Sequence, residues 1–257
     1  MALVLCLLLC ACDARKSADD DLHEARLALQ ALDWNYAERC FVRYLRVADE
    51  PESRWLAWQG LLTIVTRAGY MDRRTALDYL ETMATEYSED DAKMRILLPR
   101  MGEMAQGMRK YERALEIWDE YTQLSGLTEE ETLKGYRQLA RIYERMGRYA
   151  AAEGTLQDAL TLAQSDEERA QCLYGLADNY IAREQWQEAV DLGLQLLDLT
   201  QDKHLRGRTH FLLGDALEQQ KKLAEALQQF ELAREGYPNA LAVDNRVAYL
   251  KKKLGRK

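Results

Sequence analysis

The chain has 257 residues, of which 47% are hydrophobic and 30% are charged, so it can bury a core and is not a disordered tail. Its formal net charge of −8 would repel phosphate backbones, which excludes nucleic acid as the expected partner. Only three prolines interrupt a sequence rich in Ala, Leu, Glu, Gln and Arg, a composition that favours helix almost throughout. We therefore expect an all-α protein.

An apolar segment at residues 2–11 opens the chain and ends directly before Cys12. It is too short for a transmembrane helix, which needs about twenty apolar residues, and is typical of the hydrophobic region of a secretory signal. Leu9, Cys10 and Ala11, which stand before Cys12, resemble the lipobox of bacterial lipoproteins.

The lipobox resemblance implies a lipoprotein signal peptide at residues 1–11, acyl chains on Cys12 and a polar tether at residues 12–20. The mature protein would then be lipid-anchored in the cell membrane and face the periplasm or the exterior. Met1 and Ala2 carry no basic residue of the kind that begins a signal, so a cytosolic protein with an apolar N-terminal overhang is the alternative.

Two weaker helical patterns follow the tether. Residues 33–45 place Trp34, Ala37 and Phe41 at helical spacing and fit the second helix of a pair. Residues 53–83 fit a helix pair with a longer turn. We interpret these segments as two degenerate repeat units.

Clearer repeats occupy the rest of the chain up to residue 239, so that residues 21–239 form one repeat array. One column of small residues lies in the first helix of each unit and a second column lies in the second helix, in steps of 38, 37 and 37 residues. The first column is Gly102, Ala140, Ala177 and Gly214, and the second is Ala114, Ala152, Ala189 and Ala226. An internal period of this length is typical of a solenoid of stacked helix pairs, each burying its apolar face against its neighbours.

The expected helix boundaries agree with this period. Residues 128–131 and 165–168 each place a hydroxyl residue three positions before a glutamate, which predicts a capping box at the start of a helix. Gly147 suits the left-handed conformation that ends a helix. Residues 240–257 predict a helix that caps the last unit, with Leu241, Val247, Leu250 and Leu254 on its apolar face, followed by a basic tail.

The columns resemble the tetratricopeptide repeat. Residues of the last unit carry this resemblance most fully, namely Gly214, Leu217, Leu223, Ala226, Phe230, Ala233 and Pro238. The period of about 37 is longer than the family's 34, and Gly193 stands where Phe230 stands in the last unit. The resemblance implies an α-solenoid of antiparallel helix pairs wound into a right-handed superhelix.

Residues suited to catalysis or metal binding are scarce. His23 begins a sequence like a zinc-hydrolase motif, but Leu27 stands where the second ligand should be. Phosphate-binding glycine loops and nucleophile elbows are missing from the sequence. Cys40 and Cys172 lie in helical patterns and are expected to be buried and unpaired. We therefore expect no catalytic residue, no metal, no cofactor and no small-molecule substrate.

The tetratricopeptide resemblance implies a peptide-binding groove lined by the first helices of the pairs. The family's groove positions fall on Lys134, Arg137, Arg141, Arg145, Tyr174, Asp178, Phe211 and Asp215. A row of arginines suits an acidic segment or a C-terminal carboxylate, because the guanidinium group binds carboxylate with two hydrogen bonds. In the alternative reading, Glu131 and Glu144 pair with those arginines on a solvated surface.

Together these features predict a non-catalytic, membrane-anchored scaffold that binds a protein or peptide and assists assembly of an envelope complex. Two alternatives are a soluble cytosolic adaptor and an accessory subunit of an envelope enzyme.

Overall fold

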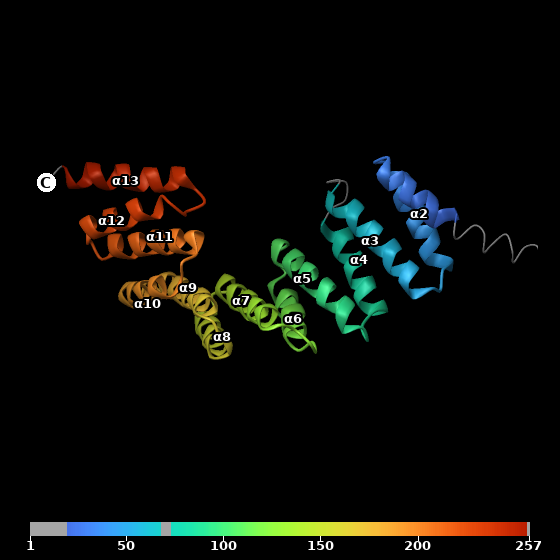
Figure 1. Cartoon of the computed structure of the whole chain (residues 1–257), viewed down its shortest axis with the longest axis horizontal. Helices are drawn as coiled ribbons and strands as arrows, with labels where there is room; N and C mark the ends of the chain where they lie inside the picture. Colours follow the sequence, from blue (N-terminus) through green and yellow to red (C-terminus); the bar gives the residue numbers. More distant parts are fainter. Residues whose placement is uncertain (1–19, 68–72, 256–257) are drawn as a thin grey trace, which may run out of the picture. The chain divides into compact units, whose positions relative to one another are not determined.

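The computed structural model describes residues 20–67 and 73–255, and in these ranges it contains helices and turns but no strand (Figure 1). The all-α expectation is confirmed. The predicted signal peptide, Cys12 and the tether up to residue 19 lie outside the described residues. No described helix combines the length and the apolar character that crossing a membrane would require. The chain divides into two compact units, Met1–Met108 and Arg109–Lys257, which are described separately.

Unit 1 is a row of helices in which each packs against the next from α2 to α5. A helix at residues 20–30 is followed by α2 (Trp34–Val47), α3 (Pro51–Arg67), α4 (Arg73–Glu86) and α5 (Asp91–Gly107). The ring of Phe41 on α2 lies so close to Gly60 on α3 that a Cβ atom there would be 2.3 Å from it. Both degenerate repeat segments therefore fold as the helices predicted for them.

The described part of unit 2 consists of helix α6, three helix pairs that follow it and a closing helix (Figure 1). The elements are α6 (Tyr111–Thr122), α7 (Glu129–Arg145), α8 (Tyr149–Leu162), α9 (Asp166–Ala182), α10 (Trp186–Leu199), α11 (Lys203–Gln219), α12 (Leu223–Ala233) and α13 (Ala240–Leu254). The first helices α7, α9 and α11 are 17 residues long and begin 37 residues apart. The predicted period is thus the spacing of the helix pairs.

Both predicted capping boxes are present. The Thr128 hydroxyl accepts a hydrogen bond from the Glu131 amide, and the Glu131 carboxylate accepts one from the Thr128 amide at 2.8 Å. Ser165 and Glu168 repeat the arrangement at the start of α9. Capping satisfies amide groups that have no partner within the helix, which explains why α7 and α9 begin where they do.

The turn inside each helix pair closes in the same way. Gly147 has a φ of 72°, as predicted, but Glu184 and Lys221 occupy the equivalent turns with φ of 59° and 63°. In each turn an amide reaches back five residues to a helix carbonyl, as Arg148 N does to Tyr143 O at 2.8 Å. This hydrogen bond is that of a Schellman motif, and it holds two non-glycine residues in the left-handed region.

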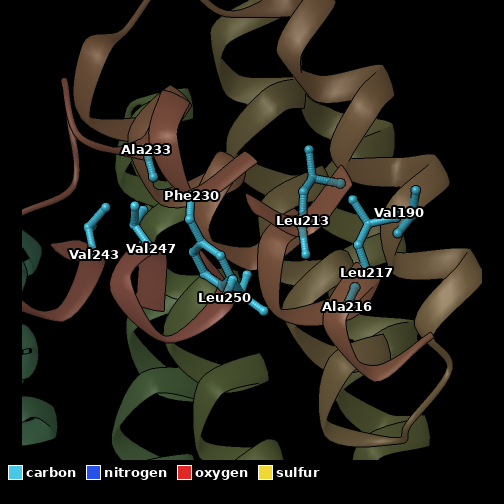
Figure 2. Packing of buried hydrophobic residues seen from close by; sticks show 10 residues of the cluster. Val190, Leu213, Ala216, Leu217, Phe230, Ala233, Val243, Val247 and Leu250 are labelled. Atoms are coloured by element: carbon cyan, nitrogen blue, oxygen red, sulfur yellow. The ribbon is translucent and has the colours of Figure 1, made fainter. Parts of the chain in front are cut away.

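The core of the last pair is built around Phe230. Its ring is fully buried and packs on Gly214, where a Cβ atom would lie 2.8 Å from it. Figure 2 shows Phe230 between Val243 and Val247 of α13 on one side and Leu213 of α11 on the other. Helix α13 therefore closes the solenoid, as predicted.

The packing differs from expectation at Leu241, and it explains why a glycine stands at position 193. Leu241 is 70% exposed, and Val243 is buried instead, because α13 packs through Val243, Val247 and Leu250. At Gly193, which replaces the aromatic residue of the last unit, the side chain of Leu213 fills the space and would lie 2.7 Å from an added Cβ. Cys40 and Cys172 are buried and free, as predicted.

Candidate functional site

A cavity of about 750 Å³ opens on unit 2 along the first helices of the pairs. α7 packs against α9, and α9 packs against α11, so these helices form one continuous surface. Side chains from all three line the cavity, including Arg137, Arg141 and Glu144 of α7, Tyr174 and Asp178 of α9, and Arg208 of α11. The sequence predicted this surface as the groove.

Arg137 and Arg141 lie one turn apart on α7 and both face the cavity. Arg137 is partly buried and Arg141 is exposed. Burial lowers the pKa of the Arg137 guanidinium, although an arginine remains charged at neutral pH. Within the part of the chain that the structure describes, neither side chain has an ion-pair partner within 4.0 Å.

Other arginines of unit 2 do have partners. Arg206 donates to the backbone oxygens of Leu197 (2.6 Å) and Thr200 (3.0 Å) at the end of α10. Arg183 pairs with Glu153 at 2.6 Å. The arginines with structural roles are therefore already bonded to the protein, whereas Arg137 and Arg141 present their donors to the cavity.

The proposed pairing of these arginines with acids of their own surface is not found among the described contacts. The Glu131 carboxylate is held in the capping box with Thr128, and Glu144 makes no ion pair within 4.0 Å of its carboxylate. Glu144 nevertheless lines the same cavity, one turn from Arg141. The groove thus contains opposite charges that are near each other but not joined.

Tyr174 and Arg208 form the far wall of the cavity. The guanidinium carbon of Arg208 lies 4.2 Å from the centre of the Tyr174 ring, a cation–π contact. Burial raises the pKa of Tyr174, so its hydroxyl is protonated at neutral pH and can donate a hydrogen bond. The Arg208 guanidinium is therefore held beside the Tyr174 ring at the wall of the cavity.

Two carboxylates in the cavity have raised pKa values. Burial, followed by the nearby negative charge of Asp178, raises the pKa of Glu144 to about 7. Asp178 remains partly open to solvent, but the surrounding groove raises its pKa as well, against the lowering effect of Arg208 and Arg141. Near neutral pH the charge of the groove therefore depends on pH.

Four of the predicted groove residues, Arg137, Arg141, Tyr174 and Asp178, are brought together around the cavity. Arg145 is exposed one turn beyond Arg141 and is not part of the lining. The ammonium group of Lys134 lies 5.9 Å from the centre of the Trp118 ring, outside the cavity.

Phe211 and Asp215 are occupied by the C-terminal part of unit 2. The Phe211 ring stacks on Tyr237 with ring centres 4.1 Å apart, and Asp215 accepts a hydrogen bond from Arg246 of α13 at 2.8 Å. Arg246 also lies 3.3 Å from Glu218. The closing helix therefore covers the end of the groove that these two residues were expected to line.

Arg208 and Gln171 line the cavity but were not among the predicted site residues. Both lie in the same column as Lys134, at intervals of 37 residues. Extending that column along the repeats would have found them, because equivalent positions of successive first helices face the same surface.

Outside the cavity, three residues of unit 1 have side-chain atoms of the kind that can bind a metal ion. Oxygen or sulfur atoms of Asp21, Glu24 and Cys40 come within 4.8 Å of one another. The Arg43 guanidinium contacts Asp21 at 2.5 Å, and the Tyr36 hydroxyl donates to Glu24 at 2.7 Å. These contacts account for the cluster without a metal ion.

Comparison with known proteins places the fold among tetratricopeptide arrays. The tetratricopeptide repeat family model matches residues 131–202 and 168–239. A comparison with curated proteins finds no match.

Several solved structures share the fold. The apo form of RapI superposes with a TM-score of 0.64 at 15% identity, covering 93% of this chain and 72% of that one. A putative kinesin light chain from Podosopora anserina, described as having nearly identical TPR-like repeats, gives 0.54 at 20% identity over 73% and 96% of the two chains. MamA from Desulfovibrio magneticus RS-1 gives 0.52 at 19% identity over 69% and 92%. At such identities the likeness concerns the fold alone. The two matched segments together run from α7 to the residue before α13, which is less than half of the chain.

Proposed function

We propose that the protein is a non-catalytic scaffold that binds an acidic segment of another protein in the groove of unit 2. The observation that carries this proposal is the pair Arg137 and Arg141, which line the cavity without an ion-pair partner among the described residues. Repeat solenoids present extended surfaces of this kind to peptides. The family match at residues 131–239 supports the same reading.

The arrangement of donors favours a carboxylate ligand. Two guanidinium groups one turn apart offer planar pairs of N–H donors, and a carboxylate can accept two hydrogen bonds from each such pair. Arg208 adds a third guanidinium across the cavity. An aspartate or glutamate side chain, or a C-terminal carboxylate, would satisfy these donors.

Charge reversal in the groove tests the proposal. An octa-aspartate peptide blocked at both ends serves as the probe, and the same peptide with a free C-terminus separates terminal from side-chain recognition. We expect Arg141→Glu to weaken binding of the probe at least tenfold in titration calorimetry while helicity and melting temperature stay unchanged, because Arg141 makes no ion pair to a described residue.

Lys222→Glu is the matched control, since it makes the same change of charge at an exposed turn of unit 2. Long-range electrostatics alone would weaken binding equally in both variants. Equal loss in the two variants, or unchanged binding by Arg141→Glu, would contradict the groove assignment.

The proposed setting is the bacterial cell envelope. The lipobox-like residues before Cys12 support lipid anchoring, and the scaffold would then hold a partner at the outer side of the cell membrane during assembly of an envelope complex. We expect Cys12→Ala to move the full chain from the membrane fraction to the soluble fraction. Recovery of the wild-type chain itself in the soluble fraction would favour the soluble adaptor, and co-purification with an enzyme would favour the accessory subunit.

A further inference from the structure

Four carboxylates line the cavity together with the arginines, and two of them, Glu144 and Asp178, have a consequence for binding. Glu144 on α7 and Asp178 on α9 line the same cavity as Arg137, Arg141 and Arg208. No ion pair within 4.0 Å joins either carboxylate to a described residue. An anionic ligand that reaches the arginines must therefore come close to both acids.

We propose that Glu144 and Asp178 act as a proton-operated gate, which repels acidic segments when both acids are ionised and admits them when Glu144 takes up a proton. The gate is a regulatory part of the proposed binding function and rests on it. Its two carboxylates come from neighbouring repeats, so it exists only in the stacked array.

Charged groups face this pair from each neighbouring first helix. Arg141 and Arg145 of α7 lower the pKa of Glu144, whereas burial and Asp178 raise it to about 7. The surrounding groove raises the pKa of Asp178, against the lowering effect of Arg208 of α11 and of Arg141.

The Glu153 carboxylate of helix α8 is already bonded to residues of the protein. Glu153 accepts a hydrogen bond from the Tyr180 hydroxyl at 2.8 Å and pairs with Arg183 at 2.6 Å. Asn179 is buried beside the pair, and its amide nitrogen donates to the backbone oxygen of Tyr149 at 3.2 Å. Glu167, Asp202 and His204 also line the cavity: Glu167 accepts a hydrogen bond from the Thr200 hydroxyl, and the ring nitrogen Nδ1 of His204 lies 3.1 Å from the Gly236 backbone oxygen.

Protonation and ligand binding must influence each other equally. A bound anion places negative charge beside Glu144 and raises its pKa further, and by thermodynamic linkage protonation of Glu144 tightens binding of the anion. If the anion raises this pKa by about one unit from about 7, affinity at pH 6 exceeds affinity at pH 8 by about fivefold.

Calorimetric titration of the full chain with blocked octa-aspartate at pH 6 and pH 8, at one ionic strength, tests the gate. The probe remains fully ionised at both values, so a change in affinity reports on the protein. We expect wild type to bind about fivefold more tightly at pH 6. Glu144→Gln should bind at pH 8 nearly as tightly as wild type does at pH 6.

Glu188→Gln is the control, because Glu188 is an exposed carboxylate of α10 outside the cavity, and this variant should keep the dependence on pH. Carboxyl carbon NMR of Glu144 gives a second measurement without ligand, with an expected midpoint near pH 7. A midpoint near 4.5, or equal wild-type affinity at both pH values, would overturn the gate and leave the binding function standing. Failure of the probe to bind at either pH would instead contradict the binding function.

Discussion

Helix α5 of unit 1 and helix α7 of unit 2 have the same length but different residues at the groove positions. α5 and α7 both contain 17 residues and begin 38 residues apart. Where α7 carries Lys134, Arg137 and Arg141, the equivalent positions of α5 carry Ile96, Pro99 and Glu103. The packing of a solenoid restricts residues between helices, whereas groove positions are free to differ. Unit 2 therefore has basic residues at these groove positions, where unit 1 has none.

The core packing, in contrast, is similar in the two units, because in each of them an aromatic ring packs against a glycine of the neighbouring helix. In unit 1 the ring of Phe41 occupies the space left by Gly60, and in unit 2 the ring of Phe230 occupies the space left by Gly214. Both rings are almost completely buried. An aromatic residue facing a glycine lets two helices approach closely while the space between them stays filled.

Removing either ring should have the largest effect. Phe230→Ala and Phe41→Ala should each lower the free energy of unfolding by about 3–5 kcal/mol, because a buried ring is lost and a cavity remains. Hydrogen exchange on the full chain locates the damage. We expect Phe230→Ala to accelerate exchange mainly in α11–α13 and Phe41→Ala mainly in α2 and α3. Equally faster hydrogen exchange in both units, in either variant, would contradict the claim that the two units have separate cores.

A close backbone contact in unit 2 should give the next largest effect. A Cβ atom on Gly207 of α11 would lie 2.4 Å from the backbone of Gly236, which precedes α13. Gly207→Ala should therefore lower the free energy of unfolding by about 1–3 kcal/mol, because the loop must move. Denaturant titration measures the change.

Gly154→Ala is the control for this prediction. An added Cβ atom there meets nothing within 4 Å, so the substitution inside α8 should stabilise the protein by about 0.5–1 kcal/mol. Destabilisation of similar size by both substitutions would show that the close contact is unimportant.

A smaller effect is expected from two glutamates whose pKa values are shifted in opposite directions, Glu86 in unit 1 and Glu144 in unit 2. In unit 1 the hydrogen bond from Arg54 lowers the pKa of Glu86, so the stabilisation by Glu86 is present above the unfolded pKa and is lost as pH falls through the folded value. In unit 2 burial raises the pKa of Glu144 to about 7, so stability is lost as pH rises from about 4.5 through 7.

At pH 8, Glu86→Gln should therefore destabilise the protein and Glu144→Gln should stabilise it. Each change should be on the order of 1 kcal/mol, since partial solvation reduces the full electrostatic effect. The effect of Glu144→Gln should nearly vanish at pH 4.5. Denaturant titrations at the two pH values check both signs, and changes of the same sign at pH 8 would contradict the stated environments.

Much of the fold was predictable because its determinants are local or periodic. The small residues in steps of 37 fixed the helix pairs, and the hydroxyl–glutamate spacing fixed where α7 and α9 begin. Glu184 and Lys221 in left-handed turns were not predicted, because a Schellman motif can impose that conformation on residues that do not favour it.

Only those site residues whose surroundings are set by the repeat pattern were predictable. Arg137, Arg141, Tyr174 and Asp178 converge because equivalent positions of successive first helices face one surface. Phe211 contacts Tyr237, at the end of the repeat array, and Asp215 contacts Arg246 of the closing helix α13. The register of the closing helix depends on tertiary packing, so the repeat pattern holds no information about it.

NMR of the arginine side chains tests the central claim most directly. The Nε–Hε signals of the full chain are followed at pH 6 while blocked octa-aspartate is added. Binding in the unit 2 groove predicts that the signals of Arg137, Arg141 and Arg208 shift together and saturate, while that of Arg100 in unit 1 stays in place. Saturating shifts of Arg100 without movement at Arg137 and Arg141 would contradict the assignment of the binding surface.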